Sequence, residues 1–229
     1  MNHFIFSAVL VFFLSLLAAL YFIFKPGTQR YFGFFWLSVA FWTFFVGFQF
    51  PIIERISGRT WGWWLHIGCI SVPIVYYHFS LMWTGNSSRR LLWIGYGLFS
   101  AFILLNTFTD LFTGENVFRT YYHYPKPAAL YPLYIVFFQF YGVLSTWEIF
   151  ELRKQIVVPG RQFIYIFLAV HLLAWVGAMD NYLIMYDRLI FPLYPYGLYF
   201  ILPYIVIGSW TFLKIQSYKT GHSVPRGLS

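Results

Sequence analysis

Seven long apolar segments constrain the fold of this chain more than any other feature. Each holds about 20 residues with few charges, the length that an α-helix needs to cross a hydrocarbon core of about 30 Å. Backbone N–H and C=O groups cannot remain unpaired in lipid, so such segments are expected to be helical. The sequence therefore predicts an all-α, polytopic membrane protein with seven transmembrane helices. Their approximate ranges are 4–24, 31–53, 63–84, 91–109, 130–152, 162–185 and 194–215.

The overall composition supports the same class of protein. Of 229 residues, 60% are hydrophobic and only 10% are charged, whereas about 25% of residues are charged in soluble domains. The only cysteine, Cys69, lies inside an apolar segment and excludes an intramolecular disulfide. The net charge of +8 gives no reason to expect a nucleic-acid partner, because no basic run with interleaved aromatic residues is present.

The distribution of Lys and Arg predicts the orientation in the membrane. Ten of the fifteen basic residues fall on one side of the predicted bundle: Lys25, Arg30, Arg89, Arg90, Arg153, Lys154, Arg161, Lys214, Lys219 and Arg226. Five fall on the other: Arg55, Arg59, Arg119, Lys126 and Arg188. The side richer in Lys and Arg normally faces the cytoplasm. We therefore expect the N-terminus outside, the C-terminus in the cytoplasm, and the lipid bilayer of the cell (inner) membrane as the surroundings.

Two parts of the chain lie outside this helical pattern. The longest loop, "TGENVFRTYYHYPKPAA" at 113–129, is rich in aromatic and turn residues and predicts a short strand or hairpin on the outer side. Residues 1–216 are expected to form one membrane domain and 217–229 a cytoplasmic tail, in which "VPRG" resembles part of an engineered protease site. We expect no catalytic domain in this chain and no enzyme activity.

Polar residues within the apolar segments are the main functional candidates, because they are costly in hydrocarbon and usually face a bundle interior. In segment 63–84, one helical face carries small and polar residues and is expected to turn inward: Gly68, Ser71, Val75, His78, Met82 and Gly85. Pro73 is expected to kink this helix, and Pro203 is expected to kink the last one. For His78, hydrogen bonding is favoured over ligand binding or proton sensing.

A second polar stripe is expected on segment 130–152. Tyr134, Tyr141, Ser145 and Glu148 recur at helical spacing on one face, whereas Gln139 points elsewhere. Glu148 lies near the cytoplasmic end, where a structural ion pair with Arg153 or Lys154 is favoured.

The outer ends of several helices carry further polar residues at a similar depth. Asp180 and Asn181 lie in the outer third of segment 162–185, and Gln49 and Asn106 lie near the outer ends of two other segments. Together they outline an outward-facing cavity. His66 and Asp110 lie at the same level, but simple solvation at the interface is favoured for both. The predicted ligand-binding residues are Asp180, Asn181, Asn106, Gln49, Tyr134, Gln139, Tyr141, His78 and His171.

No cofactor or metal site is predicted. His78 and His171 have similar expected depths, so a bis-histidine haem between their helices stays open as a minor alternative. A retinal chromophore is not expected, because its Schiff base requires a lysine deep in the last helix, whereas Lys214 lies at the end of the last segment. Nucleotide loops, zinc spacings and nucleophile motifs are absent from the sequence.

Three stretches resemble the N-terminal seven-helix sensor region of bacterial and archaeal membrane histidine kinases, which also precedes diguanylate and adenylate cyclases. "FGFFWLSVAFWTFFVGF" is similar to the family's Phe/Leu run around a Trp, here Trp42. "CISVPIVYYHFSLMWTG" is similar to its proline, His-Phe and Thr-Gly pattern, and "FPLYPYGLYF" to its Tyr-Pro-Gly signature. The similarity covers nearly the whole chain, although the usual signalling helix and output domain are not in it.

The resemblance implies a sensory module that binds a small or lipophilic ligand and signals to an attached or partner cytoplasmic histidine kinase or cyclase. A homodimer stays open. The alternative function is a small-molecule or proton-coupled transporter, or a membrane redox protein, in which His78, Glu148 and His171 would carry protons or substrate. A third alternative is an anchoring subunit whose polar residues only join helices.

Overall fold

The computed structural model describes residues 3–53, 55–87, 89–118, 123–184 and 196–220, without the side chains of 180–184 and 220. Long helices dominate this part of the chain. They are α1 (His3–Ile23), α2 (Thr28–Gly47), α4 (Gly58–Thr84), α5 (Arg90–Phe108), α6 (Tyr131–Glu151) and α7 (Val158–Ile184). Shorter elements are α3 (Gln49–Ile53), β1 (Thr113–Phe118), β2 (His123–Pro127) and η1 (Leu152–Lys154).

The last helical segment is irregular. It begins with the 3-10 turn η2 (Gly197–Phe200) and the short α8 (Ile201–Pro203), continues as the π-helical η3 (Tyr204–Gly208), and ends with α9 (Ser209–Thr220). The expected disturbance at Pro203 is thus present as a change of helix type. A π-helical turn widens the helix by one residue and is often found at functional sites.

Six helical segments in the described part of the chain are long and apolar enough to cross a bilayer. They are His3–Ile23, Gly58–Thr84, Arg90–Phe108, Tyr131–Lys154, Val158–Met179 and Gly197–Lys219. Helix α2, which completes the seven segments of the sequence pattern, is not one of the six. It is rich in aromatic residues, and its indoles at Trp36 and Trp42 are buried. The all-α fold and the multi-pass membrane character are confirmed; the count of seven spans stays a prediction.

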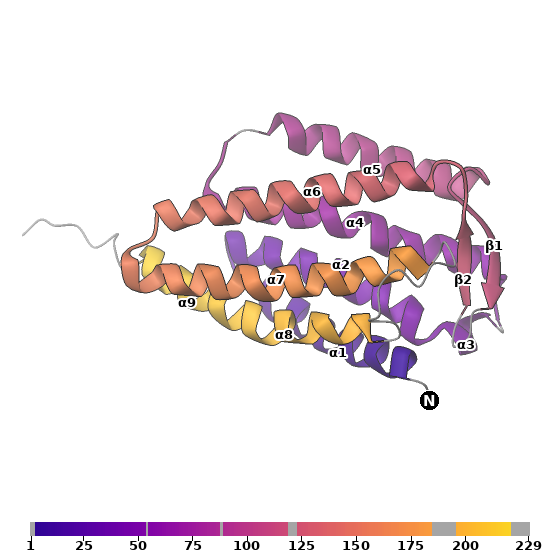
Figure 1. The fold of residues 1–229 in the computed structure, drawn as a ribbon, viewed down its shortest axis with the longest axis horizontal. Coiled ribbons are helices and arrows are strands. Elements are labelled where there is room, and N and C mark those ends of the chain that lie inside the picture. The colour runs from indigo at the N-terminus through magenta and orange to yellow at the C-terminus, as the bar shows by residue number, and fades with distance from the viewer. Residues whose placement is uncertain (1–2, 54, 88, 119–122, 185–195, 221–229) are drawn as a thin grey trace, which may run out of the picture.

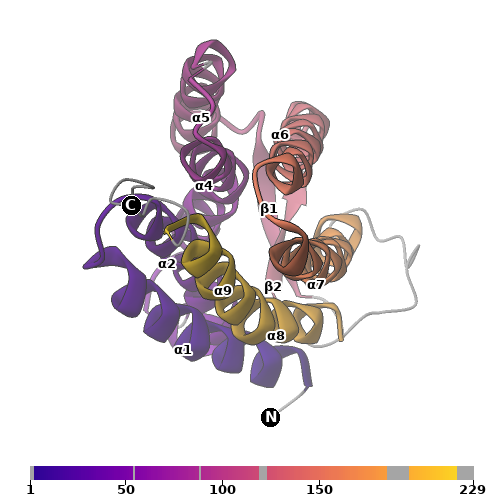
Figure 2. The same cartoon turned by 90° about the vertical axis from the view of Figure 1, so that its left-hand side faces the viewer.

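The helices run along one common direction, and the hairpin closes the end at which α1 begins (Figure 1). Figure 2, an end-on view, shows α1 and α5 at opposite edges of the bundle and α4 between α5 and α2. Burial agrees with this arrangement, because 67% of the apolar window of α4 is buried and only 22% of that of α5. Helix α4 is therefore the most buried of the six, and α2, α5 and α6 pack against it.

Close packing at glycine shapes the contact between α2 and α4. A Cβ atom added to Gly68 would lie 2.7 Å from the Trp42 backbone nitrogen. Apolar side chains gain little from leaving lipid for a protein interior, so membrane helices rely on such close approach. The expectation that the face of Gly68, His78 and Met82 turns inward is wrong in part. His78 and Met82 are only half-buried, while Tyr76 and Tyr77 on the opposite side are buried, because neighbours cover α4 on several sides.

The strands β1 and β2 pair antiparallel, with Val117 opposite Tyr124 and Phe118 opposite His123. This confirms the hairpin expected in the longest loop. Phe112 just before β1 and Tyr124 in β2 are buried, and both rings contact the imidazole of His66. The imidazole is itself buried, so the favoured idea that His66 is solvated at the interface is wrong. The hairpin covers it from the end of the bundle.

Candidate functional site

A cavity of about 70 Å³ lies in the middle of the bundle. It is partly open, and its wall is carbon almost throughout. Side chains from α2, α4, α6, α7 and the irregular last segment form this wall, with aromatic rings as the largest contributors. The rings include Trp36, Trp42, Tyr76, Trp175 and Tyr204. A volume of this size admits several water-sized spheres, but an apolar wall gives water few partners and favours an apolar ligand.

Of the seven sequence-predicted residues whose side chains the structure describes, His171 is the one that lines the cavity. Its imidazole stacks on the ring of Tyr76, with centroids 4.7 Å apart and planes at 23°, and meets Tyr204 edge-on at 5.5 Å. Its Nε2 lies 3.1 Å from the hydroxyl of Thr146 on α6. The Tyr204 hydroxyl donates to the Tyr76 hydroxyl at 3.0 Å, which joins the π-helical turn to α4. The imidazole therefore lies where α4, α6, α7 and the last segment meet.

Tyr134 has a different role, because it supplies a hydrogen-bond donor that helix α4 lacks. Pro73 has no amide hydrogen, so the carbonyl of Cys69, four residues earlier, lacks its usual helical donor. The Tyr134 hydroxyl donates to this carbonyl at 2.9 Å. An unpaired carbonyl would be costly in hydrocarbon. Tyr134 of the polar stripe on α6 thus faces α4, and its hydroxyl is engaged with the backbone.

Tyr141, one step further along the same stripe, also bonds to main chain. Its hydroxyl donates to the carbonyl of Leu91 at 2.8 Å. A Cβ on Gly95 would lie 2.8 Å from this hydroxyl oxygen, so the absence of a side chain there makes room for the tyrosine. Tyr141 therefore fixes α5 to α6 and does not line the central cavity.

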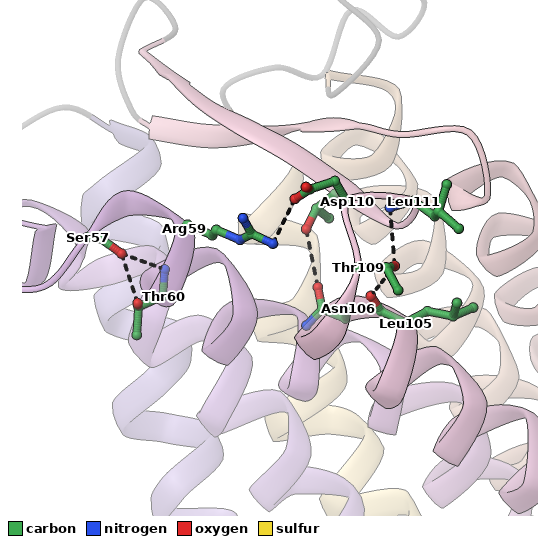
Figure 3. Close-up of polar contacts among 9 residues, drawn as sticks. Ser57, Arg59, Thr60, Leu105, Asn106, Thr109, Asp110 and Leu111 are labelled. Carbon is green, nitrogen blue, oxygen red and sulfur yellow. Dashed lines mark hydrogen bonds and ion pairs between the residues drawn. The ribbon is translucent and has the colours of Figure 1, made fainter.

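Gln49 and Asn106 hold the hairpin at the end of the bundle. Both side chains are fully buried. Gln49 accepts from the backbone N–H of His123 at 2.5 Å, and Asn106 accepts from the Thr113 hydroxyl at 3.3 Å while donating to the Trp63 carbonyl at 3.1 Å. Figure 3 shows Asn106 at the end of α5, below the turn that leads into β1. The side-chain oxygens of both residues thus fasten the hairpin, while the Gln49 amide nitrogen donates to the Val46 carbonyl at 2.9 Å.

The same corner carries an ion pair and a helix cap. Arg59 and Asp110 approach to 2.7 Å, with both side chains exposed (Figure 3). Asp110 is thus exposed as expected, but it is paired with Arg59 and not simply solvated. Exposed pairs of this kind contribute little to stability. Ser57 accepts from the Thr60 amide and begins α4.

His78 faces away from His171. Its Nδ1 lies 2.8 Å from the Tyr96 hydroxyl of α5, and its ring lies 4.6 Å from that of Tyr31 on α2. This is the favoured hydrogen-bonding role. The two histidines contact different residues, so the geometry of the described residues does not assemble the bis-histidine pair.

The three remaining predicted residues add less. Gln139 is half-buried on α6 and does not line the cavity. The backbone of Asp180 and Asn181 continues α7, two and three residues beyond the cavity-lining Ala178. Their side chains lie outside the described residues, and so does the loop with Asp187 and Arg188.

The ion pair expected for Glu148 is wrong. Glu148 accepts from the Thr84 hydroxyl at 3.3 Å and from the Asn86 amide at 3.0 Å, whereas Arg153 and Lys154 pair with Glu151. The helix carries Glu148 toward the end of α4, one turn before the charged residues. There, a carboxylate has better-placed donors in Thr84 and Asn86.

The end of α4 is also bound by three other segments. The last carbonyls of a helix have no helical donor. Thr28 at the start of α2 donates to the Met82 carbonyl, Gln155 after η1 donates to that of Thr84, and Lys219 of α9 donates to that of Trp83. The end of α4 therefore fixes the position of α2, of the turn after α6 and of the last helix.

Sequence reasoning missed most of the cavity. Trp36, Trp175 and Tyr204 contribute large parts of its wall, but aromatic residues at helical spacing are equally typical of packed cores and of lipid-facing surfaces. Their order along the chain carries no signal that separates these roles. Only the packing of helices from both halves of the chain places them around one space.

The fold defines a multi-pass helical membrane protein with an apolar central cavity. Neither the protein-family models nor the curated proteins compared with this chain give a match. The resemblance to kinase sensor regions thus stays an expectation based on three short motifs.

Proposed function

We propose that this chain is a seven-helix membrane receptor module that binds a small apolar ligand in the central cavity. The observation that carries the proposal is the cavity itself, whose carbon wall is shared by α2, α4, α6, α7 and the last helical segment. A ligand there touches elements from both halves of the chain. It can shift their packing only if it binds two arrangements with different affinity.

The last helical segment is the element proposed to respond. Its π-helical turn, Tyr204–Gly208, begins with a residue of the cavity wall. A π-helical turn can be lost or moved with little change in backbone bonding, which rotates the part of the helix that follows. That part is α9, which ends at the Lys219 contact with the Trp83 carbonyl. The effect of a ligand in the cavity would thus extend along α9 to the end of the bundle where α4 and α9 end.

In this proposal the protein lies in the inner membrane of the cell, α2 is the seventh span, and the end of α9 faces the cytoplasm. The excess of Lys and Arg, ten against five of fifteen, supports this orientation. The sequence resemblance supports an attached or partner histidine kinase or cyclase as the recipient of the signal. The module itself is not proposed to be an enzyme.

Fluorobenzene is a suitable test ligand because it is small and apolar and is observable by ¹⁹F NMR. The full chain in lipid nanodiscs is expected to bind it saturably, beyond its partition into empty nanodiscs. Ala174→Leu places extra carbon in the cavity wall and is expected to abolish this binding. Ala101→Leu, on the exposed side of α5, is the matched control and is expected to leave it unchanged.

The conformational part needs a distance measurement. Spin labels on cysteines at the exposed positions Arg90 and Lys214 report the position of α9 relative to α5, while the native Cys69 is buried and should not label. Saturating fluorobenzene is expected to change the distance distribution in the wild-type background but not in Ala174→Leu. Binding without any distance change would reduce the protein to a binding module and overturn the receptor proposal.

A further inference from the structure

The hydrogen bonds of Thr146 bear on which nitrogen of His171 carries the proton. The Thr146 hydroxyl has one proton, and it lies in position to donate this proton to the Gly142 carbonyl at 2.9 Å. In this arrangement the hydroxyl oxygen accepts from His171 Nε2 at 3.1 Å. We assign the proton of His171 to Nε2 on this basis.

The surroundings of His171 keep the imidazole neutral. The rings packed against it are Tyr76, Trp175 and Tyr204, none of which carries a charge. A buried cation without a nearby counter-charge is strongly disfavoured in such surroundings. A neutral imidazole with its proton on Nε2 leaves Nδ1 as a hydrogen-bond acceptor. No described residue donates to this nitrogen.

The other polar groups around the cavity are covered or already paired. The indole N–H groups of Trp36, Trp42 and Trp175 are buried within protein atoms, and the hydroxyls of Tyr76 and Tyr204 bond to each other. The described cavity wall carries no charged side chain. Nδ1 of His171 is therefore the nitrogen acceptor among the described residues that line the cavity, beside the oxygens of the paired tyrosine hydroxyls.

We propose that the cavity selects a small, uncharged, apolar molecule with one O–H or N–H donor, which bonds to Nδ1 of His171. This inference rests on the proposed function and narrows the class of its ligand to molecules such as simple phenols and indoles. The ring of the ligand lies against the aromatic wall, and its donor replaces the partner that Nδ1 lacks. A buried acceptor left unpaired is costly, so a ligand that satisfies it gains affinity over one that cannot.

Three probes of similar size differ in the group that they carry opposite the fluorine: a hydrogen-bond donor, an acceptor alone, or a methyl group. They are 4-fluorophenol, 4-fluoroanisole and 4-fluorotoluene, and their binding to the full chain in nanodiscs is measured by ¹⁹F NMR after subtraction of lipid partition. We expect 4-fluorophenol to bind roughly five- to tenfold more tightly than the other two. His171→Phe keeps a ring in the cavity wall but has no acceptor, so this preference should disappear.

Thr146→Val provides the second variant. It removes the acceptor of the Nε2 proton, so the protein no longer fixes one tautomer of His171, and Nδ1 can then donate as well as accept. The preference for 4-fluorophenol is expected to shrink, while 4-fluoroanisole gains affinity relative to 4-fluorotoluene. This gain depends on the tautomer and does not follow from a general loosening of the bundle. It also decides the matter if His171→Phe fails to fold.

The outcomes separate this inference from the proposed function. Equal, saturable binding of all three probes to the wild-type chain would overturn the donor rule and leave an apolar receptor cavity. An unchanged phenol preference in Thr146→Val would overturn the assignment to Nδ1. If none of the three probes, nor fluorobenzene, bound saturably, the proposed function itself would fall.

Discussion

The hydroxyl of Tyr134 on α6 occupies the place of the amide hydrogen that Pro73 cannot provide within α4. It donates at 2.9 Å to the carbonyl of Cys69, four residues before the proline. One bond thus lets a proline lie in the wall of the central cavity without an unpaired carbonyl in the middle of the bundle.

Tyr134→Phe is expected to lower the stability of the folded protein by about 1 kcal/mol, because the Cys69 carbonyl loses its donor. In a Pro73→Ala background, the amide of residue 73 supplies that donor, and the same substitution should cost much less. Thermal unfolding of the four proteins of this double-mutant cycle in one detergent measures the difference. Equal losses in the two backgrounds would show that the hydroxyl does not replace the amide.

Gly177→Ala is expected to disturb the packing of the last helical segment. A Cβ at this position would lie 2.2 Å from the carbonyl oxygen of Gly197, so α7 and η2 must move apart. Such overpacking typically costs about 1–3 kcal/mol. Gly97→Ala is the control, since a Cβ there meets nothing within 4 Å. Melting temperatures that fall equally in both variants would contradict this close approach.

Lys219→Met is expected to loosen the end of α9 from the end of α4, because the carbonyl of Trp83 loses its donor. Hydrogen exchange of the amides of residues 209–219 should become faster. Lys214→Met removes a charge from an exposed position of the same helix and serves as the control. Unchanged exchange in Lys219→Met, or the same acceleration in both variants, would show that the contact does not hold the helix.

The hairpin is expected to dock less firmly in acid. Burial lowers the pKa of His123 below its usual value near 6.5, since its ring lies against Phe118 and Phe50. Above this value both the docked and the undocked hairpin are neutral at His123. As the pH falls below about 6.5, His123 is protonated more readily in the undocked hairpin than in the docked one, so docking weakens. The weakening ends once the pH is below the lower pKa of His123 in the docked form.

Hydrogen exchange of the non-proline amides of residues 123–127 measures this effect, with rates corrected for the intrinsic dependence on pH. Protection should be lower at pH 5 than at pH 7.5, and His123→Phe should remove most of the difference. A pH dependence that persists unchanged in His123→Phe would show that it arises from a group other than His123.

The sequence by itself determined the class of fold and several local features. Apolar length specifies membrane helices, because the thickness of the hydrocarbon core is fixed. The spacing of Tyr134, Tyr141 and Ser145 correctly placed them on one buried face of α6, because residues three or four apart share a face of any helix. Aromatic and turn residues correctly indicated the hairpin.

Only the tertiary structure decided which polar residues meet a cavity and which meet a backbone. Gln49 and Asn106 had the depth and chemistry of ligand-binding residues, but they fasten the hairpin through His123 and Thr113. His171 lies beside Tyr76 and Tyr204, from segments far away in sequence. Helical periodicity gives the direction of a side chain around its own axis, whereas its partner depends on how the helices pack, and that is set by long-range contacts such as those at Gly68 and Gly177.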